Sequence, residues 1–332
     1  MPLVLLNGKM AESWQEPLAR LAGADFEFRP MVDGLSEPRL FRDADVLVSP
    51  NFDRSMPAMG ALRLLQVPLI GTDQVFLDEL WPQVTVANVT GHATAVAEYV
   101  LMAMLISARN AIEIAGAFRG GSWEHSSRMS GPPSAELEGR TVAVVGFGHI
   151  GRAVARRSAA MGMTVTVCNR TPIKAADVSA YYQLDALREC LAGADYIVVA
   201  IDLAANTRGL IGEAELRALQ KSAVIINVAR GECVDEAALY AACSAGRIGG
   251  AVIDTWYQYP SATDRSPRPS RFGFDLLPNV IMTPHVSAWT EGTIERRQAQ
   301  IVTNLQNLRD GLPLDRVVAN GQAATKWSAM QC

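Results

Sequence analysis

Short apolar runs alternate with helical or turn-rich segments along the first ninety residues of the chain. Runs of this kind, rich in Val, Leu and Ile, are typical of buried strands. Their alternation with helices predicts a parallel sheet whose strands are joined by crossover helices. The predicted strands of this sheet are Leu3–Leu6, Val46–Ser49, Pro68–Ile70 and Val84–Ala87.

A second α/β pattern follows one long helical segment. Residues Ala93–Phe118 are rich in Ala, Met, Leu and Ile and contain no proline, which predicts a single helix. A glycine- and proline-rich loop comes next, and the apolar runs after it predict a doubly wound parallel sheet. Its predicted strands are Thr141–Val145, Thr164–Cys168, Tyr196–Ala200, Val224–Val228 and Gly250–Asp254.

The pattern changes again towards the end of the chain. Residues Trp256–Pro278 are rich in Pro, Ser, Arg and aromatic residues and predict an extended loop, whereas Thr290–Asp310 predicts a polar helix. Residues Ala323–Cys332 are interpreted as a tail. At 332 residues the chain is roughly twice the usual domain size, so we expect two α/β domains.

Composition narrows the possible partners. The chain is 49% hydrophobic and 19% charged, with a formal net charge of -4, which excludes long disorder. It has no run of like charges that would attract a nucleic-acid backbone or an anionic membrane, so neither partner is expected. The longest apolar-rich stretch, Val96–Ala108, contains Glu98 and is too short for a membrane span.

The five cysteines are widely spaced and accompanied by only four histidines, so neither a disulfide framework nor a metal site is expected. The amino terminus lacks the basic region of a signal peptide. We therefore expect a cytoplasmic protein that contains no metal.

A glycine motif follows the predicted strand that ends at Val145 and precedes a predicted helix. A Gly-x-Gly-x-x-Gly motif between a strand and a helix predicts a dinucleotide site, because backbone N–H groups at the helix start can bind a pyrophosphate. The alternative is a glycine-rich turn without a ligand. The predicted site comprises Gly146, Phe147, Gly148, His149, Ile150 and Gly151.

The end of the next strand predicts which dinucleotide is bound. An acid there usually binds the ribose 2′-hydroxyl of NAD, but this chain has Asn169, followed by Arg170 and Thr171. A neutral amide does not repel a 2′-phosphate, and an arginine can bind one. The segment favours NADP, although NAD is used if Arg170 is only a solvated loop cation.

Arg230 follows an apolar strand of a parallel sheet, at the edge where ligands bind. An arginine there can bind a carboxylate with both nitrogens and polarise a neighbouring carbonyl. His285, between Pro284 and a segment of small residues, can give a proton to a forming alkoxide or take one from a hydroxyl.

Three segments together resemble the D-isomer-specific 2-hydroxyacid dehydrogenase family. Asn227–Leu239 is similar to its arginine signature, Thr283–Ser287 to its histidine segment, and Asn88 with Val96–Glu98 to the start of its interdomain helix. The resemblance implies two Rossmann-like, doubly wound parallel-sheet domains and a homodimer. The nucleotide domain, residues 96–289, is inserted in a discontinuous substrate domain, residues 1–95 and 290–332.

The resemblance also implies further site residues. It places Ala229, Asp254 and Thr94 beside the cofactor and Gly71 in a loop that binds the substrate carboxylate. Candidates for contact with the rest of the substrate follow a substrate-domain strand; they are Asn51, Phe52 and Arg54. The reaction implied is hydride transfer between NADP(H) and the α-carbon of a small 2-oxo or 2-hydroxy acid, as in glyoxylate and hydroxypyruvate reductases.

One position departs from the family pattern. The family carries a glutamate, just before a proline, that pairs with the catalytic histidine, and this chain has Tyr259 there, before Pro260. We place Tyr259 with Arg230 and His285 in the predicted catalytic group. A neutral phenol can form a hydrogen bond with an imidazole but cannot stabilise its cation by charge.

Two alternative functions therefore stay open at this point. Formate dehydrogenases of the same superfamily carry a neutral glutamine at the position of Tyr259, so another hydride donor is an alternative substrate. A nucleotide-sensing corepressor-like protein is another alternative, and the presence of both Arg230 and His285 argues for catalysis instead.

Overall fold

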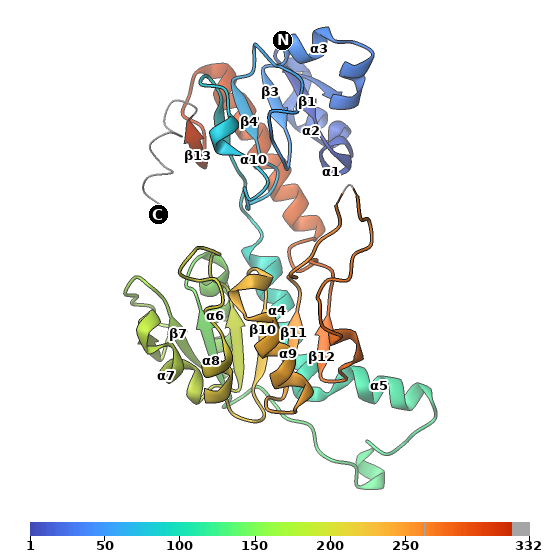
Figure 1. The fold of residues 1–332 in the computed structure, drawn as a ribbon, viewed down its shortest axis with the longest axis vertical. Coiled ribbons are helices and arrows are strands. Elements are labelled where there is room, and N and C mark those ends of the chain that lie inside the picture. The colour runs from blue at the N-terminus through green and yellow to red at the C-terminus, as the bar shows by residue number, and fades with distance from the viewer. Residues whose placement is uncertain (262, 321–332) are drawn as a thin grey trace. The chain divides into compact units, whose positions relative to one another are not determined.

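The computed structural model describes residues 1–261 and 263–320, and the chain forms two compact units (Figure 1). The first unit consists of residues 1–91 and the chain from Glu291 onward, and the second consists of residues 92–290. The chain therefore leaves the first unit once and returns to it through one long helix, α10 (Glu291–Asp310).

The first unit is built on a six-stranded sheet with the order β13-β5-β4-β3-β1-β2. Five strands are parallel, as predicted, but β13 is antiparallel to β5 at the edge of the sheet. The strands are β1 (Leu3–Leu6), β2 (Glu27–Pro30), β3 (Val46–Val48), β4 (Leu64–Gln66), β5 (Thr85–Ala87) and β13 (Val317–Asn320). The helices besides α10 are α1 (Lys9–Glu12), α2 (Gln15–Ala22) and α3 (Arg39–Asp43).

The predicted strand at Pro68–Ile70 is wrong, because the strand in this part of the chain is β4, a few residues earlier. Residues Leu64–Gln66 pair with β3 on one side and β5 on the other. Pro68 has no N–H to donate to such a ladder, which disfavours a central strand at that position. Both stretches are apolar, so the hydrophobic pattern alone did not distinguish them.

The second unit is built on a seven-stranded parallel sheet with the order β12-β11-β10-β9-β6-β7-β8. The strands are β6 (Thr141–Val145), β7 (Thr164–Cys168), β8 (Ala180–Tyr182), β9 (Tyr196–Val199), β10 (Val224–Asn227), β11 (Gly250–Ile253) and β12 (Val280–Met282). The helices are α4 (Ala93–Arg109), α5 (Ala111–Arg119), α6 (His149–Ala160), α7 (Leu187–Ala192), α8 (Glu213–Ala218) and α9 (Glu236–Ser244).

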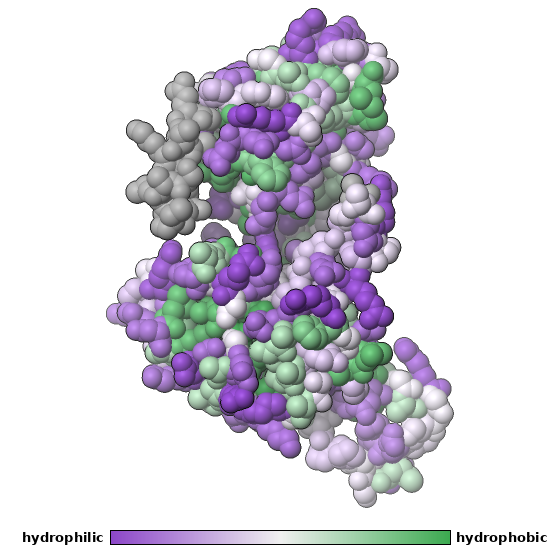
Figure 2. All heavy atoms as spheres, in the orientation of Figure 1, coloured by the Kyte–Doolittle hydropathy of each residue, from purple (hydrophilic) through white to green (hydrophobic). Residues whose placement is uncertain are grey.

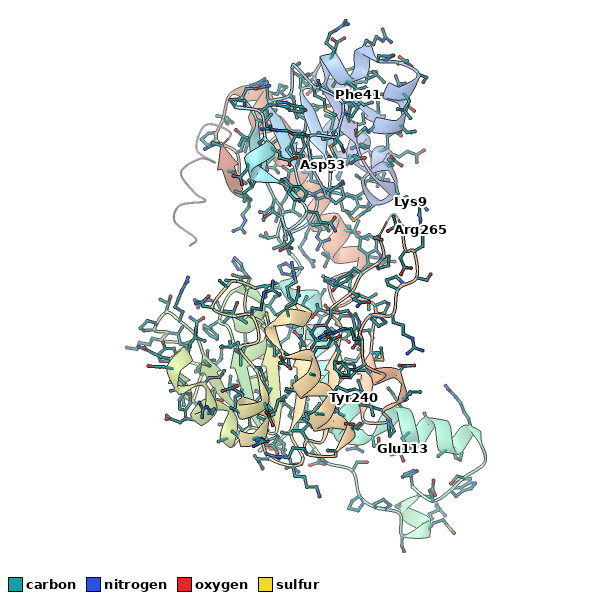
Figure 3. All side chains as sticks on the ribbon, in the orientation of Figure 1. Lys9, Phe41, Asp53, Glu113, Tyr240 and Arg265 are labelled. Carbon is teal, nitrogen blue, oxygen red and sulfur yellow. The ribbon has the colours of Figure 1, made fainter. Side chains whose placement is uncertain are left out.

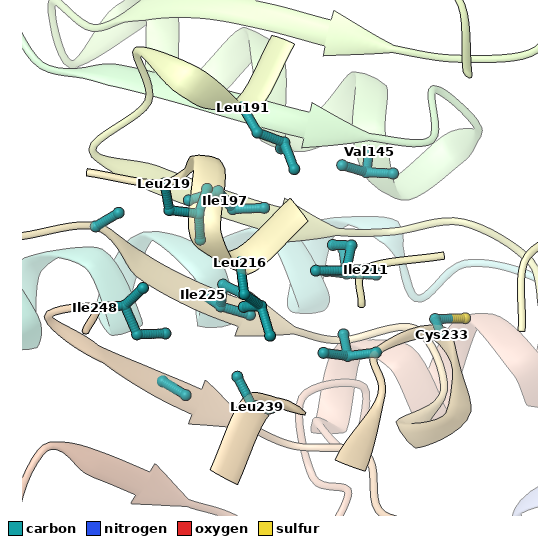
Figure 4. Close-up of a cluster of buried hydrophobic side chains, with 14 of the residues drawn as sticks. Val145, Leu191, Ile197, Ile211, Leu216, Leu219, Ile225, Cys233, Leu239 and Ile248 are labelled. Atoms are coloured by element: carbon teal, nitrogen blue, oxygen red, sulfur yellow. The ribbon is translucent and has the colours of Figure 1, made fainter. Parts of the chain in front are cut away.

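Both faces of the second sheet are buried. Side chains alternate along each strand, so Val145 and Ala143 belong to one core cluster while Val144 and Val142 belong to the other. The first cluster is covered by side chains of α7, α8 and α9, including Leu191, Leu216 and Leu239 (Figure 4). Burial on both faces explains the continuous apolar runs by which the sequence predicted these strands.

The predicted single helix Ala93–Phe118 is two helices. Asn110 adopts the left-handed conformation with φ 48° and ends α4, and α5 begins at the next residue. Asparagine tolerates this conformation better than most residues, so the break costs little. Helix α5 has no buried residue, and Figure 2 shows apolar side chains among the polar ones along it and the segment that follows.

No single helix among the described residues is long and apolar enough to cross a bilayer. Helices α4 and α5 meet that criterion of length and composition only when taken together, as a pair bent by 58°.

Arg297 is a charged residue on the buried face of α10. Its side chain is 4% exposed, and it lies on the helix between Thr293 and Ile301, which are fully buried. Its Nε has no hydrogen-bond partner within the described part of the chain, and desolvation alone lowers the pKa of the guanidinium. A buried cation without a carboxylate partner opposes folding.

We therefore expect Arg297→Met to raise the free energy of unfolding, by about 1–4 kcal/mol, because methionine fills similar space without a charge. Urea denaturation followed by circular dichroism measures the change. Arg296→Met is the matched control, since Arg296 is exposed and its Nε donates to the Gly91 carbonyl oxygen at 2.7 Å. A less stable Arg297→Met protein would contradict the prediction.

Candidate active site

The glycine loop connects β6 to α6, and two of its glycines are required by close packing. Gly146 has φ 96°, and a Cβ there would collide with the carbonyl oxygen of Ala200, the residue after β9. A Cβ at Gly151 would collide with the carbonyl oxygen of Gly146. The loop therefore turns tightly against the neighbouring strand end, which only glycine allows.

Gly148 differs, because a Cβ at this position would have no protein atom within 4 Å. It is the N-cap of α6, a twelve-residue helix, and no side-chain hydrogen bond caps the helix start. The first N–H groups of the helix therefore remain available, and backbone at Gly148 can be approached closely by a ligand. These features fit the pyrophosphate of a dinucleotide.

Asn169 joins the glycine loop to the segment after β7. Its Oδ1 accepts a hydrogen bond from the Phe147 N–H at 3.2 Å, and its Nδ2 donates to the Thr171 carbonyl oxygen at 2.8 Å. Arg170 and Lys174 are exposed beside it and form no ion pair with any residue in the described ranges. The segment after β7 therefore presents two exposed cations, and an amide stands at position 169 where an acid is usual in NAD-binding sites.

Arg230 is positioned by the side chain of Asn227, the last residue of β10. Asn227 Oδ1 accepts from the Ala229 N–H at 3.1 Å, and its Nδ2 donates to the Arg230 carbonyl oxygen at 3.0 Å. A Cβ at Gly231 would lie 2.5 Å from the Trp256 carbonyl oxygen, so the arginine loop packs directly against the loop after β11. Asn227 was missed as a site residue, although it stands inside the arginine signature.

Asp254 follows β11 and holds the segment that carries His285. Its fully buried carboxylate accepts three hydrogen bonds, from Thr283 Oγ1 at 2.6 Å, from the Val286 N–H at 2.9 Å and from the Ser287 N–H at 2.9 Å. The hydroxyl of Tyr99 on α4 lies 2.6 Å from the same Thr283 Oγ1. Asp254, predicted beside the cofactor, is thus already bonded within the protein and fixes the histidine loop.

His285 is held in a conformation that few residues adopt. Its φ is 57°, which costs a residue with a side chain roughly 1–2 kcal/mol. After His285, the N–H groups of Val286 and Ser287 donate to Asp254 and stabilise the turn. Before it, the Thr283 carbonyl oxygen accepts a hydrogen bond from Trp256 Nε1 at 2.8 Å. These hydrogen bonds of the neighbouring backbone offset the strain at His285.

Tyr259 contacts His285 directly. The phenol oxygen lies 2.9 Å from Nδ1 of His285, and it accepts a hydrogen bond from the Trp256 N–H at 3.0 Å. Desolvation raises the pKa of Tyr259, and the Trp256 hydrogen bond and the charge of Arg230 oppose this effect. The phenol is therefore neutral at ordinary pH, as the sequence led us to expect.

The loop that supplies Trp256 and Tyr259 is fastened at its far end to α9. Glu236 accepts hydrogen bonds from Ser270 Oγ at 2.8 Å and from the backbone and side chain of Arg271 at 2.9 and 2.8 Å. Tyr240, also on α9 and labelled in Figure 3, has its ring stacked on that of Phe272, with ring centroids 5.1 Å apart. These contacts fix the returning half of the loop, although its sequence predicted only extended chain.

The two remaining candidates of the second unit, Thr94 and Ala229, differ in exposure. Thr94 is exposed in the first turn of α4, whereas Ala229 is 7% exposed and accepts a hydrogen bond from its neighbour Arg230 at 2.8 Å. Within residues 1–261 and 263–320, no group of three or more His, Cys, Asp or Glu side chains could hold a metal ion.

The substrate candidates belong to the first unit. Asn51 follows β3, and its Oδ1 accepts from Nδ2 of Asn7, which follows β1, at 3.4 Å; Asn7 Nδ2 also donates to Ser49 Oγ at 2.8 Å. The strand order reverses between β1 and β3, which is where an open α/β sheet binds ligands. Asn7 was missed, although it directly follows an apolar run.

The other candidates of the first unit differ in accessibility. Phe52 is fully buried and packs edge-on against Trp81 at 5.3 Å, so its ring has no surface for a ligand. Arg54 is exposed, and its side chain donates to the carbonyl oxygens of Glu79 and Asp78 at 3.4 Å. Gly71 directly follows Ile70, whose carbonyl oxygen accepts a hydrogen bond from Asn88 Nδ2 at 2.7 Å.

Within the second unit, the glycine loop, Arg230, Tyr259 and His285 all follow strands of one parallel sheet at their carboxyl ends. This arrangement supplies a dinucleotide site, a cation for a carboxylate and an imidazole for proton transfer. The model of the D-isomer specific 2-hydroxyacid dehydrogenase, NAD binding domain, matches residues 101–287. The chain belongs to this family.

Proteins similar to this dehydrogenase match it along most of its length. It is 30% identical to a glyoxylate reductase from Thermococcus gammatolerans over 279 residues, 81% of each chain. A glycerate dehydrogenase from Methylorubrum extorquens is 33% identical over 263 residues, 78% of this chain and 79% of the relative. The solved structure of an NADPH-dependent glyoxylate/hydroxypyruvate reductase from Sinorhizobium meliloti, in complex with citrate, is 27% identical with a TM-score of 0.80, covering 97% of this chain and 99% of that one.

The predicted family and fold are confirmed by these comparisons. The protein is an oxidoreductase of the D-2-hydroxyacid dehydrogenase type, and its cofactor is a nicotinamide dinucleotide. The antiparallel edge strand β13 is the exception to the predicted parallel sheets.

Proposed function

We propose that this dehydrogenase reduces a small 2-oxo acid of the glyoxylate or hydroxypyruvate type, with NADPH preferred over NADH. The arrangement of Arg230 and His285 at the carboxyl edge of the sheet that carries the glycine loop supports the reaction. The second unit is then the dinucleotide-binding domain, and residues 1–91 with the chain from Glu291 onward form the substrate domain.

Each group has a distinct role in this proposal. The glycine loop and the start of α6 bind the pyrophosphate, and the bound dinucleotide supplies the hydride. Arg230 binds the substrate carboxylate and polarises the neighbouring carbonyl oxygen. His285 gives a proton to that oxygen in reduction and takes it back in oxidation, and Tyr259 orients the imidazole through Nδ1.

A substrate panel tests the function. We expect glyoxylate and hydroxypyruvate to be reduced faster than phenylpyruvate, measured by nicotinamide absorbance with each cofactor. His285→Ala should abolish turnover in both directions while cofactor binding, followed by fluorescence, stays intact. Turnover of formate without turnover of either 2-oxo acid would replace the proposal with hydride transfer from formate, the alternative that the neutral Tyr259 supports.

The preference for NADP rests on Asn169 and the cations after it. The side chain of Asn169 is bonded within the protein: its amide oxygen accepts from the Phe147 N–H, and its amide nitrogen donates to the Thr171 carbonyl oxygen. Unlike the acid of an NAD-binding site, it offers no carboxylate to the ribose hydroxyls. Arg170 is exposed and free of any ion pair in the described chain, so its guanidinium is available to a 2′-phosphate.

We expect Arg170→Ala to weaken binding of NADPH by roughly 1.5–3 kcal/mol, since a charge-assisted hydrogen bond is lost, and to leave NADH nearly unaffected. Dissociation constants from fluorescence titration measure both effects. Arg156→Ala is the control, because Arg156 is an exposed arginine of α6 and not part of the segment that follows β7. Equal weakening of both cofactors would show that Arg170 does not read the phosphate.

We also propose a homodimer assembled through α5 and the segment after it. Ile112, Phe118, Trp123 and Met129 are 56–66% exposed there, and Phe118 packs edge-on against Trp123 with ring centroids 5.1 Å apart. Exposed apolar side chains gathered on a helix with no buried residue are typical of a protein interface.

Light scattering at micromolar concentration should therefore report about twice the chain mass of 35.8 kDa. Phe118→Glu should shift the particle towards the single-chain mass, because a charge would be buried at the interface. Leu35→Glu, on a likewise apolar and exposed residue of the first unit, should not. A wild-type particle of single-chain mass would contradict the dimer.

A further inference from the structure

The hydroxyl of Tyr259 is placed between a fixed donor and the catalytic imidazole. The Trp256 backbone N–H, 3.0 Å from the phenol oxygen, can only donate. Nδ1 of His285, 2.9 Å from the same oxygen, can donate or accept according to its tautomer. The direction of the second hydrogen bond therefore depends on how the phenol uses its single proton.

The Trp256 contact decides that direction. The phenol oxygen already accepts the Trp256 N–H, and Nδ1 is the other polar atom of the described residues that it contacts, so we expect its own O–H to donate to Nδ1 in preference to solvent water. Nδ1 then carries no proton, and the neutral imidazole holds its proton on Nε2. A glutamate at this position, which can only accept from Nδ1 when ionised, would impose the opposite tautomer.

The same contacts disfavour the charged imidazole. An imidazolium would present Nδ1–H to the phenol oxygen, which would then receive two N–H donors and have to turn its own proton away. The charged groups that act on Tyr259 are Arg230, Asp254 and Glu232. Asp254 is bonded to Thr283 and to two backbone N–H groups of the histidine loop, so its negative charge is already shared among three donors.

We propose that Tyr259 is the proton source of the reduction, acting through a neutral His285. The inference rests on the proposed reduction of a 2-oxo acid. Nε2–H donates a hydrogen bond to the substrate carbonyl oxygen, and Tyr259 is a positioning residue that also passes a proton through the ring.

The step balances without a further reactant. As hydride adds to the carbonyl carbon, the π electron pair moves to the oxygen, which takes the proton from Nε2. The N–H bonding pair stays in the ring, Nδ1 takes the phenol proton, and the histidine ends neutral with its proton on Nδ1. Tyr259 is left as a phenolate; the cycle closes when Nε2 takes a proton from solvent and Nδ1 returns its proton to the phenolate, and oxidation of the hydroxy acid runs the same transfers in reverse.

The surroundings of Tyr259 suit a transient phenolate. The Trp256 N–H and the charge of Arg230 both favour the ionised form, whereas desolvation, Asp254 and Glu232 keep the phenol protonated at rest. The residue is 44% exposed, so water can solvate the phenolate. Because the pKa of Tyr259 is raised, the proton source persists into alkaline solution, where an imidazolium would already be lost.

Histidine NMR on the cofactor-free protein tests the direction of the hydrogen bond. With nitrogen-labelled histidine and His285→Gln for assignment, wild type should show His285 with its proton on Nε2 and a titration midpoint below that of the Tyr259→Phe protein. Tyr259→Phe should move the midpoint up towards about 6.5 and mix the tautomers. Tyr259→Glu should place the proton on Nδ1 and raise the midpoint further.

Tyr257→Phe is the matched control. It removes the neighbouring hydroxyl of the same loop, which donates to the Val234 carbonyl oxygen at 3.1 Å, and it should leave the His285 signals unchanged. A wild-type His285 with its proton on Nδ1, or a tautomer unaffected by Tyr259→Phe, would overturn the proposal.

Kinetics supply a second readout. Reduction of glyoxylate by wild type should stay level from pH 6 to about pH 9, whereas Tyr259→Phe should lose on the order of 100-fold at pH 9 relative to pH 6, since only an imidazolium could then donate. Solvent isotope mixtures should reveal two protons in flight for wild type and one for Tyr259→Phe. Parallel pH profiles for the two enzymes would exclude the relay.

The two proposals fail in distinguishable ways. If wild type reduces no 2-oxo acid, the proposed function is wrong, and the NMR experiment still determines which atom donates. If wild type reduces glyoxylate but His285 carries its proton on Nδ1, only the relay is wrong.

Discussion

The buried carboxylate of Asp254 is the contact on which the arrangement of the catalytic loop depends. It accepts two backbone N–H groups and one hydroxyl from the segment Thr283–Ser287, and these bonds hold His285 at a positive φ. A buried ionised group is stable only when its acceptor positions are filled. The same three bonds therefore satisfy the carboxylate and offset the strain of the histidine's backbone.

Parallel strand ends explain why the other groups meet there. The glycine loop, the Arg230 loop, Asp254 and Thr283 follow β6, β10, β11 and β12, which share one carboxyl edge. Close packing of Gly231 against the Trp256 backbone then joins the arginine loop to the loop that supplies Tyr259. The first unit follows the same rule, with Asn7 and Asn51 in contact where its strand order reverses.

Tyr259 shows how one side chain determines the chemistry available to the imidazole beside it. A phenol is neutral, and its oxygen can donate as well as accept, so its partners determine the tautomer of the imidazole. Here the second partner is a backbone N–H, which no side-chain substitution other than proline removes. In our proposal, a directed hydrogen bond takes the place of the electrostatic role of a carboxylate.

The sequence by itself determined the family and the α/β class, and it predicted that the glycine loop, Arg230 and His285 follow strands, because each depends on a local pattern of strand, turn and helix. It misplaced the strand near Pro68 and joined α4 to α5, since ladder pairing and the left-handed Asn110 are not visible in apolar periodicity. Its placement of Asp254 beside the cofactor stays a prediction, to which the structure adds the hydrogen bonds that the histidine loop donates to this carboxylate. Only the tertiary structure brought the Trp256 N–H onto Tyr259, because the direction of a hydrogen bond depends on every neighbour of the oxygen in space.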